Sequence, residues 1–107
     1  MRQLALAAAL ALLALPAIAE EPSFTLLIRN HRFEPASLEV PAGQKIQLII
    51  KNLDASAEEF DSKSLKREKI IAGGREAVVM IGPLTAGRYP FVGEYHEDTA
   101  KGEIVAK

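Results

Sequence analysis

The 107-residue chain contains no cysteine and no tryptophan, and only two histidines and two methionines. Without cysteine it forms no disulfide bond, so its stability must come from a compact core, to which a bound metal could add. Thirteen basic and fourteen acidic side chains nearly cancel. This balance argues against a nucleic-acid partner or a general membrane-surface role. The sequence also lacks a Ser-His-Asp arrangement, a phosphate-binding loop and zinc HxxxH spacing, so hydrolase and nucleotide-binding functions have no support.

An apolar run follows Arg2 at the start of the chain, and it is too short to span a bilayer. It ends in the small-x-small triplet Ala-Ile-Ala at 17–19, a pattern typical of a secretory signal peptide. We predict that residues 1–19 are removed and that residues 20–107 form one domain. No cysteine follows to carry a lipid, and no later segment is apolar enough to cross a membrane. A free periplasmic or secreted protein is expected; an uncleaved membrane anchor is the alternative.

Short segments with alternating hydrophobicity fill most of the remaining sequence, as expected for half-buried strands. Pro41 and Gly43 stand between two of them and predict a hairpin. Regularly spaced short strands with turn signals between them predict an all-β fold, an antiparallel β-sandwich. The predicted strands are Phe24–Asn30, Ser37–Val40, Lys45–Asn52, Glu76–Ile81, Arg88–Val92 and Gly102–Ala106.

The segment from Leu53 to Gly74 carries charge in place of alternation. It predicts at most one short helical turn, around Ser64–Lys69, lying over an end of the sandwich. Its basic residues, between Lys66 and Lys69, are interpreted as a solvated face. A docking patch for a partner is the alternative.

One histidine, His96, stands among three carboxylates, Glu94, Glu97 and Asp98. A histidine in such a loop is usually solvated or paired with one acid. Imidazole together with several carboxylates also suits iron, manganese or copper(II), so a metal site is the second interpretation. His31 is most simply a turn residue, although it could approach the same end of the sandwich.

Three motifs in order resemble the cupredoxin family: F-x-P-x-x-L-x-V-P-A-G at Phe33–Gly43, G-x-Y-x-F at Gly87–Phe91, and K-G-x-I-V at Lys101–Val105. The resemblance covers nearly all of residues 20–107. It implies a cupredoxin-like Greek-key β-sandwich that carries a metal between two loops at one end.

The chain departs from the blue-copper members of that family at their ligands. Those members have a cysteine, a histidine three residues later and then a methionine; here Gly93 takes the cysteine position, His96 is kept, and no methionine follows. The first histidine of the family would come from the loop after Asn52, where this chain has Glu58 and Glu59. Thiolate and thioether ligands tune such sites for copper, so a blue-copper protein is not expected.

The segments E-E-F-D-S and R-E-K-I-I-A-G-G are similar to those of the EfeO-type cupredoxin-like domain. They also resemble the small periplasmic cupredoxin-like partners of bacterial ferrous-iron permeases. The resemblance implies an iron or copper ion held by carboxylates and imidazole. Matched residue by residue, its ligands would be Glu59, Asp61, Glu68, Glu94 and His96.

The resemblance implies an exported protein that binds iron, or copper that acts on iron. Its partner would be an iron permease or another uptake component. Such a protein would either carry ferrous iron or help to oxidise it, and an enzyme is less favoured than a metal-binding or electron-transfer protein. Contact with the membrane would occur only through the partner. The alternative is a metal-free interaction module that docks through Lys63–Lys69. The sequence leaves open the native metal and whether His31, Glu58, Glu97 or Asp98 joins the site.

The signal-peptide interpretation predicts that the mature protein begins at Glu20. Intact-mass analysis of protein recovered from the periplasm measures this directly. Recovery of a chain that retains Met1 would contradict export with cleavage.

Overall fold

The structure, a computed structural model, describes residues 21–107. The predicted signal peptide, residues 1–19, lies outside the described residues. Within 21–107, no helix is long and apolar enough to cross a membrane. The described chain forms strands and one short 3-10 helix, namely β1 (Ser23–Arg29), β2 (Arg32–Glu34), β3 (Ser37–Val40), β4 (Ile46–Asn52), β5 (Glu58–Ser62), β6 (Arg67–Ile71), β7 (Glu76–Ile81), β8 (Gly87–Gly93), η1 (Glu94–His96) and β9 (Lys101–Ala106).

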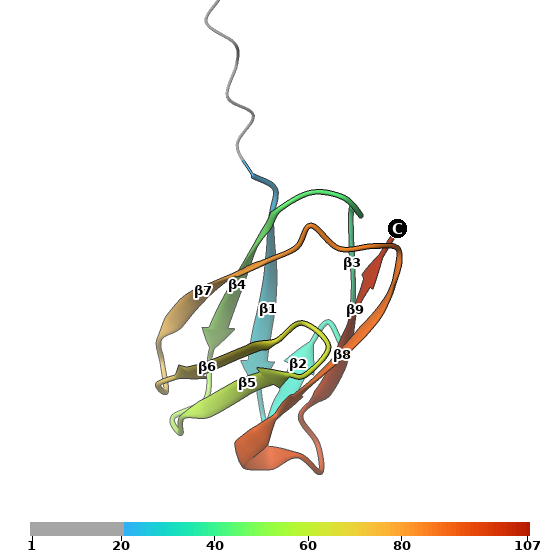
Figure 1. The fold of residues 1–107 in the computed structure, drawn as a ribbon. Helices are drawn as coiled ribbons and strands as arrows, with labels where there is room; N and C mark the ends of the chain where they lie inside the picture. The colour runs from blue at the N-terminus through green and yellow to red at the C-terminus, as the bar shows by residue number, and fades with distance from the viewer. Residues whose placement is uncertain (1–20) are drawn as a thin grey trace, which may run out of the picture.

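Two sheets pack against each other as a β-sandwich (Figure 1). One has the strand order β2-β1-β4-β7 and the other β3-β9-β8-β5-β6. Most neighbouring strands are antiparallel, but β1 pairs in parallel with β4, and β3 with β9. The predicted all-β sandwich is therefore confirmed, whereas a purely antiparallel arrangement is wrong. The sheets are mixed because the chain leaves the first sheet at β3 and returns to it at β4, beside β1 and running in the same direction.

The turn containing Pro41 and Gly43 connects the two sheets. The strands on either side of it, β3 and β4, belong to different sheets, so the predicted hairpin is wrong. The backbone N–H of Ala42 donates to the carbonyl of Lys107, and that of Gly43 donates to the carbonyl of Leu84. These bonds hold the turn as a corner of the sandwich, which satisfies its polar backbone groups without a hairpin partner.

The charged segment between Leu53 and Gly74 forms two strands, β5 and β6, paired as an antiparallel hairpin. The predicted helical turn is wrong. Buried and partly exposed residues do alternate along β5. Two of its three inward side chains, Glu58 and Ser62, are polar, and Phe60 lies between them. Because the inward face is not apolar, hydrophobic periodicity could not reveal this strand.

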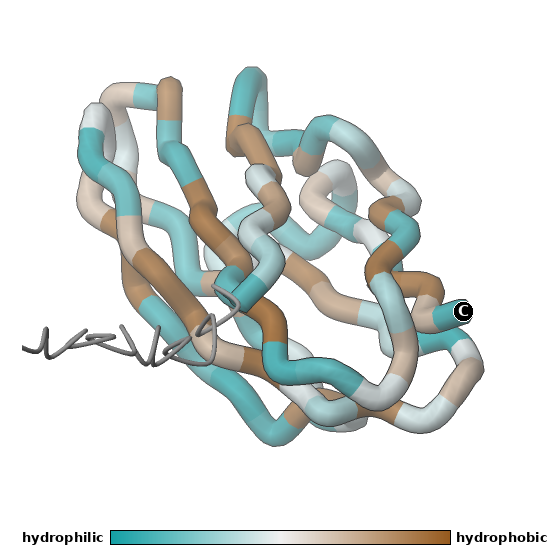
Figure 2. The backbone as a smooth tube through the Cα atoms, turned by 90° about the horizontal axis from the view of Figure 1, so that it is seen from above, coloured by the Kyte–Doolittle hydropathy of each residue, from teal (hydrophilic) through white to brown (hydrophobic). Residues whose placement is uncertain are grey.

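The core lies between the sheets, where inward residues from both pack together. Figure 2 marks the hydrophobic positions in brown along the backbone. Three aromatic rings meet near its centre, with centroids of Phe33 and Phe91 4.8 Å apart and those of Phe60 and Phe91 5.0 Å apart. A Cβ at Gly102 would lie 2.5 Å from Cζ of Phe91, so this ring needs a glycine beside it. The buried apolar residues are Leu26, Ile28, Phe33, Val40, Ile46, Leu48, Ile50, Phe60, Leu65, Ile71, Val79, Ile81, Phe91, Ala100, Ile104 and Ala106.

Four segments come together at the lower end of the sandwich in Figure 1: the β1–β2 turn, the β4–β5 loop, the start of β5, and η1. The pairing of Phe60 with Gly93 fixes β5 against the end of β8, directly before η1. The core therefore positions the segments that contain both histidines and, of the other predicted metal ligands, Glu59 and Glu94.

The aromatic cluster predicts that Phe60→Ala lowers the free energy of unfolding by about 3–5 kcal/mol, because it leaves a cavity in a fully buried position. Urea unfolding followed by circular dichroism measures the change. The matched control is Val78→Ala on the exposed side of β7, for which a change within about 0.5 kcal/mol is expected. Equal losses in both variants would contradict this account of the core.

Candidate metal-binding site

A buried carboxylate lies at the centre of this end of the sandwich. The side chain of Glu58 is 2% exposed. Its Oε1 accepts the backbone N–H of Glu59 at 3.0 Å and that of Tyr95 at 2.9 Å, and its Oε2 lies 2.6 Å from Nδ1 of His96. Among the described residues, no buried side-chain nitrogen or oxygen lacks a hydrogen-bond partner. Two of these three hydrogen bonds, those with Tyr95 and His96, fasten η1 to β5.

Gly93 makes room for this carboxylate. A Cβ at that position would lie 2.6 Å from Cδ of Glu58 and 2.6 Å from Cβ of Ala100. Contacts this short are not tolerated, so the carboxylate occupies the space that any side chain at position 93 would need. Position 93 is the one that the cupredoxin resemblance assigns to the cysteine ligand. The structure thus places oxygen atoms where that ligand would project.

The ring of His31 stacks on the ring of His96. The ring centroids of His31 and His96 are 3.5 Å apart and the ring planes differ by 12°. His31 lies in a tight turn with φ of 57°, in the left-handed region. Asp54 accepts the backbone N–H groups of Asn30 and His31 at 2.8 and 2.9 Å, and the hydroxyl of Thr99 donates to the carbonyl of His31 at 2.5 Å. The turn is therefore held from both sides.

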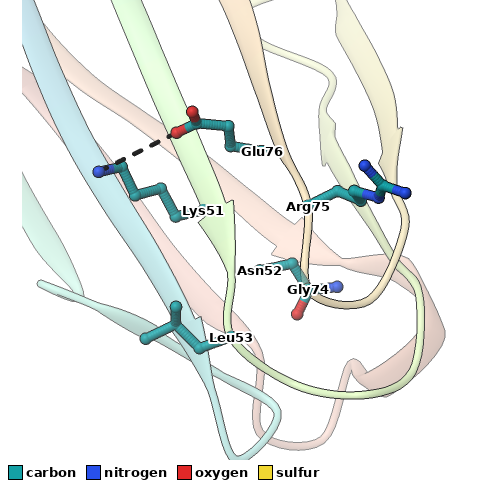
Figure 3. Close-up of a pocket in the computed structure, with 6 residues that line it drawn as sticks. All are labelled: Lys51, Asn52, Leu53, Gly74, Arg75 and Glu76. Atoms are coloured by element: carbon teal, nitrogen blue, oxygen red, sulfur yellow. Dashed lines mark ion pairs between the residues drawn. The ribbon is translucent and has the colours of Figure 1, made fainter.

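Asn52, at the end of β4, supports Asp54 in turn. Its Oδ1 accepts the backbone N–H of Asp54, and its Nδ2 donates to the carbonyls of Ser56 and Ile71. Beside Asn52 lies an open hollow of about 340 Å³, in which Lys51 pairs with Glu76 (Figure 3). This hollow does not contain the residues of the Glu58–His96 pair. Asn52 therefore contributes to the site by holding the β4–β5 loop, which contains Asp54 and Ser56, in place.

The remaining predicted ligands lie on the other face of β5. Because successive strand residues point to opposite faces, Glu59 and Asp61 face outward while Phe60 is buried. Glu68 on β6 is paired with Asp61 across the hairpin, and Glu94 begins η1. We call Glu59, Asp61, Glu68 and Glu94 the acidic face. Partial desolvation, followed by the negative charges of the other three, raises the pKa of Glu59 above its usual value.

The structure therefore separates the five predicted ligands into two groups. Four form the acidic face, whereas His96 is bound to Glu58 on the inner side of β5. Of the residues left open by the sequence, Glu58 and His31 contact His96, while Glu97 and Asp98 are exposed after η1. Within residues 21–107, no three His, Asp or Glu side chains already converge closely enough to hold a metal ion.

Two residues of the site were not assigned from the sequence. Glu58 could have been found, because it precedes Phe60 by two residues and so shares its inward face. His31 had no such signal. Its place over His96 depends on Asp54, 23 residues further along the chain, and on Thr99, 68 residues further.

Comparison with known proteins gives one family and a set of similar folds. A family model described as cupredoxin-like domain matches residues 2–106. An uncharacterized protein of Rickettsia prowazekii (strain Madrid E) is 42% identical over 80 residues, which are 75% of this chain and 64% of that protein. The chain thus spans somewhat less than two thirds of that relative.

Solved structures with the same fold include auracyanin A, a blue copper protein from Chloroflexus aurantiacus, at a TM-score of 0.68 and 14% identity, covering 79% of this chain and 98% of that one. The metal-binding domain of the Cu(I)-exporting P-type ATPase of Streptococcus pneumoniae D39, solved with Cu(I), gives a TM-score of 0.67 at 17% identity and covers 79% and 84%. A purple cupredoxin from Nitrosopumilus maritimus gives 0.61 at 15% identity and covers 78% and 98%. At these identities the likeness shows the cupredoxin-like β-sandwich alone.

The Asp54 contacts predict a pH-dependent contribution to stability. The backbone N–H of His31, with smaller effects from that of Asn30 and from the two histidines, lowers the pKa of Asp54. A lowered folded-state pKa adds stability above the unfolded-state pKa, and this is lost as pH falls through the folded-state pKa. Asp54→Asn should therefore cost about 1–3 kcal/mol at neutral pH. The difference from the parent should shrink as the pH falls from about 5 through the lowered folded-state pKa of Asp54.

Urea unfolding of both proteins across this pH range measures the difference. Asp98→Asn removes an exposed carboxylate from the same end of the molecule and is the control, with little effect expected. If the free energy of unfolding lost in Asp54→Asn stays constant with pH, the negative charge of Asp54 does not have the stabilising role described here.

Proposed function

The chain belongs to the cupredoxin-like domain family, and we propose that it is an exported metal-binding member that carries iron for a bacterial iron-uptake system. Its partner would be an iron permease or another periplasmic uptake component. The EfeO-type segments support the iron assignment, and the leader at residues 1–19 supports export. Iron would be the cargo of such a protein, bound and then passed on.

The observation that carries this proposal is the exchange of soft ligands for hard ones at one end of the sandwich. The carboxylate of Glu58 fills the space beside Gly93, and imidazole is kept at His96. Carboxylate oxygen and imidazole nitrogen suit iron, manganese and copper(II), whereas a blue-copper centre needs thiolate. The residues present therefore do not fit a blue-copper centre and do fit a harder cation.

The acidic face supplies the negative charge that such a cation would neutralise. Repulsion from Glu94, Glu68 and Asp61 contributes to the raised pKa of Glu59, so these carboxylates destabilise one another in the metal-free protein. A bound cation relieves that repulsion. We propose His96, Glu59 and Glu94 as its principal ligands, with Asp61 and Glu68 adjoining. All four carboxylates are at least partly exposed and free to turn toward an ion.

Copper(II) is the second candidate cation, because oxygen and nitrogen donors also suit it. Two proteins of similar fold, auracyanin A and the ATPase domain, are copper proteins. In this chain copper(II) would meet oxygen and nitrogen donors only. Its complex should show weak ligand-field absorption without the intense blue band of thiolate-to-copper charge transfer.

The proposal predicts that the mature protein binds iron(II) under anaerobic conditions, and that His96→Ala, Glu59→Ala and Glu94→Ala each weaken binding by at least 10- to 100-fold. Isothermal titration of each variant with iron(II), and in parallel with copper(II) and manganese(II), gives the affinities. Glu39→Ala, which removes a carboxylate paired with Lys107 far from this end, is the control and should bind like the parent.

Two outcomes would overturn the proposal. If the parent retains none of these metals, a metal-free interaction module that docks through Lys63–Lys69 becomes the better account. If His96→Ala binds all of them as tightly as the parent, the metal lies elsewhere on the protein.

A further inference from the structure

We infer that Glu58 is a positioning residue that holds His96 in the tautomer with its proton on Nδ1, so that Nε2 is the atom of this histidine that binds a cation. The inference rests on the proposed metal-binding function. It deepens that function by naming the ligand atom and the residue that prepares it.

The hydrogen bonds of Glu58 decide where the proton lies. Its Oε1 accepts two backbone N–H groups, from Glu59 and Tyr95, so the carboxyl group is placed as a hydrogen-bond acceptor. An ionised carboxylate can only accept hydrogen bonds. At 2.6 Å from Oε2, Nδ1 of His96 must therefore be the donor. A neutral imidazole with its proton on Nδ1 carries its free lone pair on Nε2.

The surroundings of His96 leave this second nitrogen as the usable ligand. Nδ1 is directed at a carboxylate that is 2% exposed, whereas the His96 side chain as a whole is 26% exposed. The ring of His31 covers one face of His96 and restricts its rotation. Histidines that bind metals commonly donate their other ring N–H to a carboxylate, which fixes the tautomer and makes the ligating nitrogen more basic. Glu58 and His96 have this arrangement.

The isosteric substitution Glu58→Gln provides a sharp test because the amide can satisfy the same site in only one way. The two backbone N–H groups of Glu59 and Tyr95 require an oxygen at the position of Oε1. The amide nitrogen must then occupy the position of Oε2 and donate to Nδ1 of His96. This hydrogen bond stabilises the opposite tautomer, with the proton on Nε2. The backbone N–H groups of Glu59 and Tyr95 and Nδ1 of His96 all keep a hydrogen-bond partner, so the variant should fold.

Imidazole nitrogen NMR of the metal-free protein measures the tautomer directly, because protonated and unprotonated ring nitrogens resonate far apart. At neutral pH the parent should show His96 with the proton on Nδ1, and Glu58→Gln should show it on Nε2. Glu97→Gln, which changes an exposed carboxylate after η1, is the matched control and should leave the tautomer unchanged. A parent in which Nε2 carries the proton would overturn the inference, whatever the variant does.

Titration with copper(II), which is paramagnetic and broadens nearby signals, then tests the ligand atom. Broadening should be strongest at Nε2 of His96, and Glu58→Gln should weaken binding by about 10- to 100-fold while its fold is retained. Broadening centred on Nδ1, or tighter binding by Glu58→Gln, would show that the buried nitrogen is the ligand and overturn the inference. If the parent binds no cation, the proposed function fails, and the metal-binding part of this inference fails with it. The tautomer measurement still separates that result from an error about Glu58.

Discussion

A carboxylate withdrawn from water is costly unless hydrogen-bond donors replace its hydration, and Glu58 is almost fully buried. Most of the geometry at this end of the sandwich follows from that requirement. The backbone of η1 and the ring of His96 supply donors, and Gly93 leaves the space that the carboxyl group fills. Replacing any one of these groups would leave either an unpaired charge or a steric clash.

The loops around the pair are joined by a second series of contacts. Asn52 holds Asp54, Asp54 holds the turn of His31, and Thr99 fastens the same turn from the C-terminal loop. Segments far apart in sequence are thereby fixed around His96 through side-chain and backbone hydrogen bonds. On β5, Glu58 faces inward to His96 while Glu59 and Asp61 face outward, and η1 carries both His96 and Glu94 beside the start of the strand.

This arrangement suits the proposed role, in which the protein would release the cation that it binds. Where a metal holds a small domain together, its removal unfolds the domain, because binding and folding share one free energy. Here the hydrogen bonds of Glu58 with Tyr95 and His96 connect β5 to η1 through protein groups. The cation proposed above would add stability to the folded protein by linkage. These contacts would stay in place when such a cargo dissociates.

The sequence by itself determined the class of fold, the strands whose inward residues are apolar, and the exclusion of a blue-copper centre, because each depends on residue type and local periodicity. It did not reveal β5, whose inward face carries Glu58 and Ser62, nor the crossing at the Pro41–Gly43 turn, which has the same local chemistry as a hairpin. The contacts of Glu58 and His31 with His96 were decided only by the tertiary structure. They join residues 38 and 65 positions apart through hydrogen bonds and stacking, and the sandwich must pack before these groups can meet.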